Sequence, residues 1–180
     1  VASAHKFHGP KGVGFAFFRK GFGILPMLHG GDQEKGARSS TESVHAIVGM
    51  EKALEIAQNA IEKDKKQILE LKAYFISELY KISDKIEFNG LSGDFEGGSY
   101  TILNVRFPVE NDMLLFSLDI AGIAVSGGSA CQSGSNSGSH VLSEILFGAE
   151  EAKTSIRFSF SRFTKKEDID LTISKLKELL

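Results

Sequence analysis

The chain has 180 residues, a hydrophobic fraction of 42% and a formal net charge of −2 at pH 7. These totals are those of an ordinary globular protein, long enough to bury a core in one domain or in one and a half. The low net charge gives no electrostatic reason to expect nucleic acid or a membrane surface as a partner, and no apolar stretch approaches the roughly 20 residues that span a bilayer.

Two strand-like segments precede a loop in the first forty residues. Residues 1–4 indicate the end of a strand, and residues 13–19, apolar, aromatic and bounded by glycines, predict a buried strand. Residues 30–38 are polar and glycine-punctuated, which predicts a loop. Because the chain opens within a strand and without a methionine, we expect it to be the later part of a longer protein.

One long helix is predicted after this loop. Ser39, followed three residues later by Glu42, matches a capping box, so the helix is expected to begin near Thr41. No proline interrupts the sequence up to about Ile82, and apolar residues recur there at near-helical spacing. Such a helix is suited to connect two domains.

The rest of the chain predicts a compact α/β sandwich. Helices and strands alternate in it, with strands expected at residues 100–107, 123–125 and 155–161, and helices at 112–121 (closed by Gly122), 140–147 and 165–180 (opened by Thr164 with Glu167). We therefore expect three parts: residues 1–42, a connecting helix over 43–83, and a C-terminal domain over 84–180.

A lysine lies between two histidines in the motif Ser-Ala-His-Lys-Phe-His-Gly-Pro-Lys-Gly, which begins at Ser3. Ser3 and His5 can donate hydrogen bonds to an anionic group such as a phosphate, next to the amine of Lys6. The glycines match neither a P-loop nor a dinucleotide fingerprint. Chemistry alone leaves open whether Lys6 or Lys11 is the reactive amine, or whether the segment is only an exposed basic loop.

The only cysteine, Cys131, lies in a glycine- and serine-rich loop over residues 126–135. A lone cysteine is most often a small buried hydrophobe, but this composition buries a thiol poorly, and exposed thiols are the reactive ones. A single cysteine forms no internal disulfide, so a reducing, cytoplasmic compartment is expected. The five histidines do not lie at zinc-ligand spacings with it, so we expect no metal site.

Four motifs resemble, in the same order, those of the NifS/IscS-type cysteine desulfurases, relatives of the class V aminotransferases. They are the lysine motif, the His-Gly-Gly segment at His29 followed by Arg38-Ser-Ser-Thr, the Ser-Gly-Gly-Ser-Ala-Cys loop, and Ser-Ile-Arg-Phe-Ser at residues 155–159. The resemblance implies the α/β fold of type I pyridoxal-phosphate-dependent transferases. This chain would hold the end of the large domain and the small C-terminal domain with the cysteine loop.

The resemblance also implies roles for single residues. Lys6, not Lys11, would form the Schiff base with pyridoxal 5'-phosphate, and Ser3 and His5 would contact the cofactor phosphate. Thr41 would reach the partner's cofactor phosphate across the interface of a homodimer. Ser40 stands where the family usually has glycine, and this departure is expected to alter the local backbone.

In the resembling family, a cysteine at the position of Cys131 attacks the sulfur of L-cysteine and takes it as a persulfide, leaving L-alanine. The sulfur then passes to an acceptor protein for iron–sulfur cluster or thiolation pathways. Arg157 would clamp the substrate carboxylate, for which a planar guanidinium is suited; Arg162 is left as structural. We expect this portion alone to be unable to complete catalysis.

Two other interpretations stay open. A selenocysteine lyase or another class V aminotransferase would keep Lys6 and Arg157. A non-enzymatic sulfur carrier or docking module would use Cys131 without a cofactor.

Overall fold

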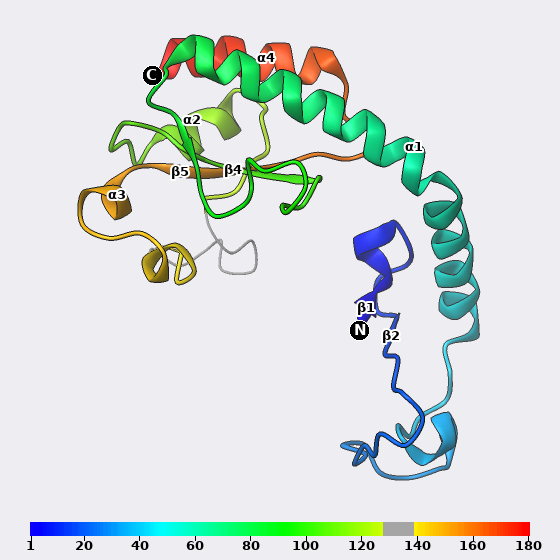
Figure 1. Ribbon diagram of the computed structural model, residues 1–180. Coiled ribbons are helices and arrows are strands. Elements are labelled where there is room, and N and C mark those ends of the chain that lie inside the picture. Colours follow the sequence, from blue (N-terminus) through cyan, green and yellow to red (C-terminus); the bar gives the residue numbers. More distant parts are fainter. Residues whose placement is uncertain (128–138) are drawn as a thin grey trace. The chain divides into compact units, whose positions relative to one another are not determined.

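A computed structural model describes residues 1–127 and 139–180 of the chain. The described residues form two compact units, Val1–Glu62 (unit 1) and Lys63–Leu180 (unit 2). The boundary between the units lies inside the long helix α1 (Val44–Ile82), which runs through both (Figure 1). In the part of the chain that the structure describes, no helix combines the length and the apolar character needed to cross a membrane.

Unit 1 begins with a short antiparallel pair of strands. β1 (Ala2–Ser3) pairs with β2 (Gly14–Phe15), and the 3-10 turn η1 (Ala4–Phe7) follows β1 directly. The prediction of a buried strand over residues 13–19 was wrong in extent and in burial, because only Gly14 and Phe15 pair, both are exposed, and Phe17 is 77% exposed. The described residues offer this segment no other strand to pair with, so the backbone beyond Phe15 has no ladder to join.

Helix α1 begins later than the capping-box pattern predicted. Its first residue is Val44, and the carbonyl of Ser43 accepts the hydrogen bond from the N–H of Ile47. Ser39 and Glu42 therefore precede the helix, whereas a second 3-10 turn, η2 (Gln33–Gly36), lies in the predicted loop. The helix runs unbroken to Ile82, as predicted, because no glycine or proline interrupts the sequence after Gly49.

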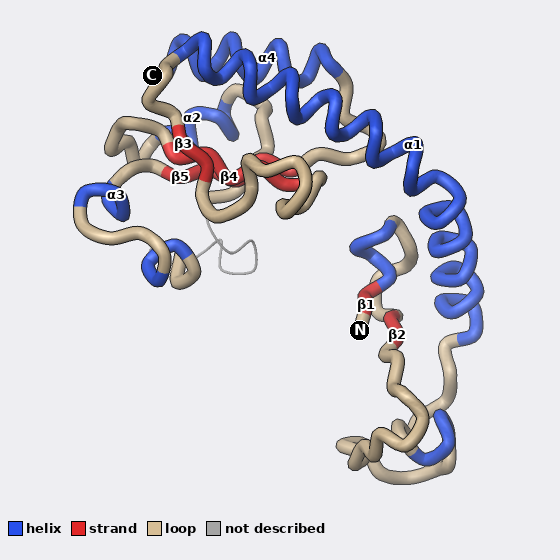
Figure 2. Tube along the Cα trace, in the orientation of Figure 1, coloured by secondary structure: helices blue, strands red, loops and turns tan. Residues whose placement is uncertain are grey.

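Unit 2 is built on a three-stranded antiparallel sheet in the order β3 (Glu87–Phe88), β4 (Ile102–Arg106), β5 (Ser155–Ser159) (Figure 2). Every second residue of β4 and β5 is buried, as expected for a sheet with one face on a core. α2 (Leu114–Ile120), α4 (Lys166–Leu179) and the second half of α1 contribute Leu118, Ile173 and Phe75 to the same cluster. The core thus lies between one face of the sheet and these helices.

Two predicted elements of unit 2 differ from the structure. Residues 123–125 form no strand; instead Ser126 makes an isolated antiparallel bridge with Arg157. The helix predicted over residues 140–147 is only the 3-10 turn η4 (Leu142–Glu144), with α3 (Ala149–Ala152) after it. Within 140–147 only Leu146 is buried, and a short helix without a packed face is marginal in water.

The last helix is close to its predicted position but opens differently. The N–H of Lys165 donates to Asp168 Oδ2 at 2.9 Å, whereas the hydroxyl of Thr164 accepts the N–H of Ser161. The carboxylate that closes the first turn is therefore Asp168 and not Glu167. Gly122 follows α2 with a φ of 78°, as its predicted capping position requires.

Candidate active site

The lysine motif forms a tight turn in unit 1. Lys6 lies exposed in η1, and two backbone hydrogen bonds close the turn: Ala4 N–H to Val13 O at 3.0 Å and Gly9 N–H to Ala4 O at 2.8 Å. A side chain at Gly9 would place its Cβ 2.9 Å from the Cβ of Ala4, which is closer than such atoms approach. The glycine therefore lets the chain fold back beneath the lysine.

Helix α1 supports the same turn from the side. A Cβ at Gly49 of α1 would lie 2.7 Å from Cγ of Pro10, so this glycine makes room for the proline ring of the motif. Ser3 is half-buried and its side chain makes no capping hydrogen bond, while His5 is exposed beside Lys6. An amine, an imidazole and a hydroxyl thus occur within four residues of one supported turn, a donor set that fits an anionic ligand with a reactive carbonyl.

Thr41 belongs to the same unit and is exposed. Its neighbour Ser40 has a φ of 115°, a backbone conformation that favours glycine. The N–H of Ser40 donates to Oε1 of Gln33 at 3.3 Å. Ser40 therefore stands, at a position where the resemblance expects glycine, in a backbone conformation that suits glycine.

Arg157 lies on β5 in unit 2, and its backbone is paired with Ser126. Arg157 N–H donates to Ser126 O at 2.7 Å, and Ser126 N–H donates to Arg157 O at 3.2 Å. Ser126 is the residue from which the chain enters the glycine- and serine-rich segment. This pairing was not predicted from the sequence, in which the strand-like pattern at residues 123–125 was its only signal.

The guanidinium of Arg157 has an unsatisfied donor. Its Nε is buried, and no hydrogen-bond partner for it occurs among the described residues. A buried polar atom without a partner costs about 1–3 kcal/mol, more when it is charged. An unpaired Nε suits a guanidinium that binds the carboxylate of a ligand.

The structure brings some of the predicted site residues together, and one of them lies outside the residues that it describes. Ser3, His5 and Lys6 share one turn, with Thr41 in the same unit, and Arg157 shares a backbone bridge with Ser126. Cys131 lies outside the described residues. The convergence of Lys6, Cys131 and Arg157 on one substrate stays a prediction.

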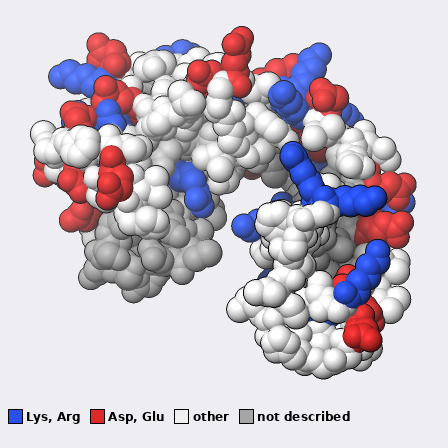
Figure 3. All heavy atoms as spheres, turned by 60° about the horizontal axis from the view of Figure 1, so that its bottom comes forward, with Lys and Arg blue, Asp and Glu red and all other residues white. Residues whose placement is uncertain are grey.

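Neither the charges on the face drawn in Figure 3 nor the metal-ligating side chains among the described residues mark a competing site. Figure 3 shows acidic and basic side chains intermixed on the face that it presents. Within residues 1–127 and 139–180, no group of three or more His, Cys, Asp or Glu side chains is arranged to hold a metal ion.

Comparison with known proteins identifies the family. The Aminotransferase class-V profile matches residues 1–172. The chain belongs to this family. It is 42% identical over 179 residues to the cysteine desulfurase IscS of Dictyoglomus turgidum, covering 99% of this chain and 45% of that protein. It is 41% identical to the cysteine desulfurase IscS of Salmonella arizonae, covering 98% of this chain and 43% of the relative. The chain thus spans less than half the length of the curated relatives it matches.

The fold of this chain is also similar to solved structures of NifS-like proteins. A NifS-like protein superposes with a TM-score of 0.82 at 34% identity, over 98% of this chain and 44% of its own. A NifS-like protein from Rickettsia africae gives a TM-score of 0.70 at 31% identity, over 88% of this chain and 40% of its own. The resemblance to the NifS/IscS-type desulfurases and the type I fold of pyridoxal-phosphate-dependent enzymes are therefore confirmed.

Proposed function

We propose that this chain is part of a cysteine desulfurase, which removes sulfur from L-cysteine to give L-alanine and a persulfide on Cys131. The observation that carries the proposal is the bridge between Arg157 and Ser126. It ties a guanidinium with an open, buried Nε to the residue five positions before the cysteine. A carboxylate bound by Arg157 would thus lie next to the start of the segment that carries the thiol.

The lysine turn of unit 1 would hold the cofactor. Lys6 would bind pyridoxal 5'-phosphate through its amine, Ser3 and His5 would donate hydrogen bonds to its phosphate, and Thr41 would serve the cofactor of the second subunit in a homodimer. When bound, this cofactor supplies an electron sink for the charge that develops at the substrate Cα. The exposed amine and the uncapped hydroxyl of Ser3 support this assignment.

The chain's own groups then perform three tasks. The guanidinium of Arg157 orients L-cysteine through its carboxylate, and the amine of Lys6 moves the Cα proton. The thiolate of Cys131 attacks the substrate sulfur, so an S–S bond forms and the Cβ–S bond breaks. The electron pair of the broken bond stays on Cβ, which takes a proton and becomes the methyl group of L-alanine.

The product is a persulfide, which a thiol-bearing acceptor protein would collect for iron–sulfur cluster or thiolation pathways. We place the enzyme in the cytoplasm, because Cys131 has no partner cysteine in this chain and its reaction requires a free thiolate.

Replacement of Cys131 by alanine tests the proposal in the whole natural protein. Sulfide release from L-cysteine in the presence of a reducing thiol should fall at least about 100-fold, because the nucleophile is lost. The visible absorbance of the bound cofactor should not change. Ser133→Ala, in the same segment, is the matched control and should keep activity within about twofold, since a hydroxyl there is given no covalent role.

The same variant separates the other interpretations. An aminotransferase would retain its activity in Cys131→Ala, and a selenocysteine lyase that needs no thiol would still release selenide. A sulfur carrier without a cofactor would show no visible cofactor absorbance in the natural protein. Any of these results would contradict the desulfurase proposal.

A further inference from the structure

The face of the unit 2 sheet that points away from the core carries a polar network around Arg157. Leu103, Val105, Ile156 and Phe158 point into the core, so the residues between them occupy the opposite face. In the register of β4 and β5, Asn104 lies opposite Arg157 and Arg106 lies opposite Ser155.

The pairing pattern brings the side chains of Asn104 and Arg157 close. The backbone N–H and C=O of Arg157 bond to Ser126 and so point away from β4. Asn104 and Arg157 therefore form a non-hydrogen-bonded pair, in which the Cα atoms lie about 4.5 Å apart and the side chains approach most closely.

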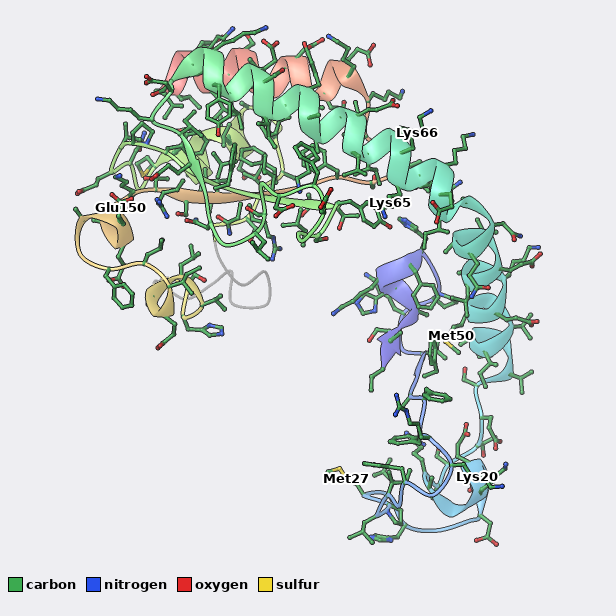
Figure 4. All side chains as sticks on the ribbon, viewed as in Figure 1. Lys20, Met27, Met50, Lys65, Lys66 and Glu150 are labelled. Carbon is green, nitrogen blue, oxygen red and sulfur yellow. The ribbon has the colours of Figure 1, made fainter. Side chains whose placement is uncertain are left out.

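Arg106 gathers two carboxylates on this face. Its Nη2 donates to Glu87 Oε2 at 2.6 Å, and its Nε lies 3.0 Å from Glu150 Oε2 on α3 (Figure 4 labels Glu150). The second contact is an ion pair without hydrogen-bond alignment, since neither buried atom has a hydrogen-bond partner among the described residues. The Arg106 side chain is only 12% exposed, so both acids meet a largely desolvated cation. A hydrogen bond from Arg106 also holds the pKa of Glu87 below its ordinary value.

Two asparagines and Ser155 complete the hydrogen bonds of the network around Arg106. Arg106 Nη1 donates to Asn89 Oδ1 at 2.7 Å. The amide nitrogen of Asn89 donates to Asn104 Oδ1 at 3.0 Å and to Ser155 Oγ at 2.9 Å. By contrast, the Arg157 guanidinium makes no ion pair and its Nε no hydrogen bond within the described residues.

We propose that Arg106 is a positioning residue that keeps Arg157 available for the carboxylate of the amino-acid substrate. It does so by binding Glu87 and Glu150, the two carboxylates of the network, which would otherwise compete for Arg157. The inference rests on the proposed function, in which Arg157 binds that carboxylate. Glu87 on β3 and Arg157 on β5 are two strand spacings and two residues apart, roughly 12 Å. Lys153 also pairs with Glu150 at 2.5 Å and with Glu87 at 4.0 Å, so loss of Arg106 leaves the two carboxylates only partly neutralised. The negative charge that remains weakens anion binding at Arg157.

Two measurements on the whole natural protein test the inference. Arg106→Gln should raise the KM for L-cysteine about three- to tenfold with kcat unchanged within about twofold, and the rise should shrink at high salt. Independently of turnover, L-alanine should protect Arg157 from modification by phenylglyoxal, followed by peptide mass. Arg106→Gln should require about three- to tenfold more alanine for the same protection.

Rescue distinguishes positioning from a merely structural role. Adding Glu87→Gln and Glu150→Gln to Arg106→Gln removes the competing charges and should restore both readouts to within about twofold of the natural protein. Arg162→Gln, which removes an arginine paired with Asp64 at 3.6 Å, is the matched control and should change neither readout. If Arg106→Gln does not fold, Arg106→Lys serves in its place, with a smaller shift and the same rescue.

The outcomes of these measurements separate the inference from the desulfurase proposal. The inference is overturned if alanine does not protect Arg157, if Arg106→Gln leaves both readouts unchanged, or if the triple variant fails to restore them. If the natural protein releases no sulfide but alanine protection depends on Arg106 as described, the desulfurase proposal fails and the inference stands.

Discussion

At the scale of single residues, Ser40 carries a backbone conformation that its side chain disfavours. Its φ of 115° lies where glycine is usual, and its N–H is held by Gln33. Ser40→Gly should raise the free energy of unfolding by about 1 kcal/mol, because relief of strain exceeds the added entropy of the unfolded chain. Urea unfolding of the natural protein and the variant measures this difference.

The adjacent Ser39 provides a control of opposite sign. It is not among the residues with positive φ, so Ser39→Gly only adds unfolded-state freedom. This variant should lower the free energy of unfolding by roughly 0.5–1 kcal/mol. Equal effects of the two substitutions would show that Ser40 is not strained.

At the scale of elements, a buried lysine joins α1 to the loop before β4. Lys72 is 0% exposed, and its Nζ donates to Ser99 O at 3.0 Å. Burial lowers the pKa of Lys72 below its ordinary value of 10.5, and the charge of Asp94 only partly opposes this. The unfolded chain therefore holds this proton to higher pH than the folded chain does, so this residue adds stability as the pH rises toward 10.5.

Lys72→Met should remove that increase. The difference in the free energy of unfolding between pH 8 and pH 10.5, measured by urea unfolding, should be less positive in the variant than in the natural protein. Lys65→Met is the matched control, because Lys65 lies exposed on the same helix (Figure 4). Identical pH slopes for Lys72→Met and Lys65→Met would contradict the assignment.

The elements also show how far the sequence alone predicts this fold. Strands β4 and β5 and helices α1, α2 and α4 follow from alternation and helical spacing, which are local signals. Among the capping signals, Gly122 marks the end of α2 correctly, whereas both predicted capping boxes were wrong. The segment at residues 140–147 was misjudged because its helical pattern has no face packed on the core. Arg106 was missed since its partners Glu87 and Glu150 lie 19 and 44 residues away, and only the sheet register brings them together.

The site residues, too, were only partly predictable from local sequence patterns. Physical chemistry alone left Lys6 and Lys11 equivalent, and only the family resemblance distinguished them. The open Nε of Arg157 was not predictable from its strand pattern, because that pattern does not tell which neighbours are already paired. The role of Cys131 depends on the resemblance and on its composition-based exposure, and it stays a prediction.

At the scale of the whole molecule, the hydrophobic core belongs to unit 2. Its cluster runs from Ile68 to Leu176, whereas the buried apolar residues described in unit 1 are Ala4 and Ala46. Eight large apolar side chains are exposed in unit 1 on the stretch after β1, with Met27 at 93% (Figure 4): Phe15, Phe17, Phe18, Phe22, Ile24, Leu25, Met27 and Leu28. The stretch from residue 16 to 28 also belongs to no helix or strand.

This distribution predicts uneven protection of backbone amides in the isolated 180-residue chain. Amides of residues 16–28 should exchange with deuterium within seconds, because they lack a hydrogen-bonded ladder and a core. Amides of β4, β5 and the second half of α1 should exchange at least about 100-fold more slowly, since their opening exposes the unit 2 core. Hydrogen exchange read by peptide mass compares the two sets in one sample. Slow exchange over residues 16–28 would show that unit 1 makes an additional core that the described contacts do not contain.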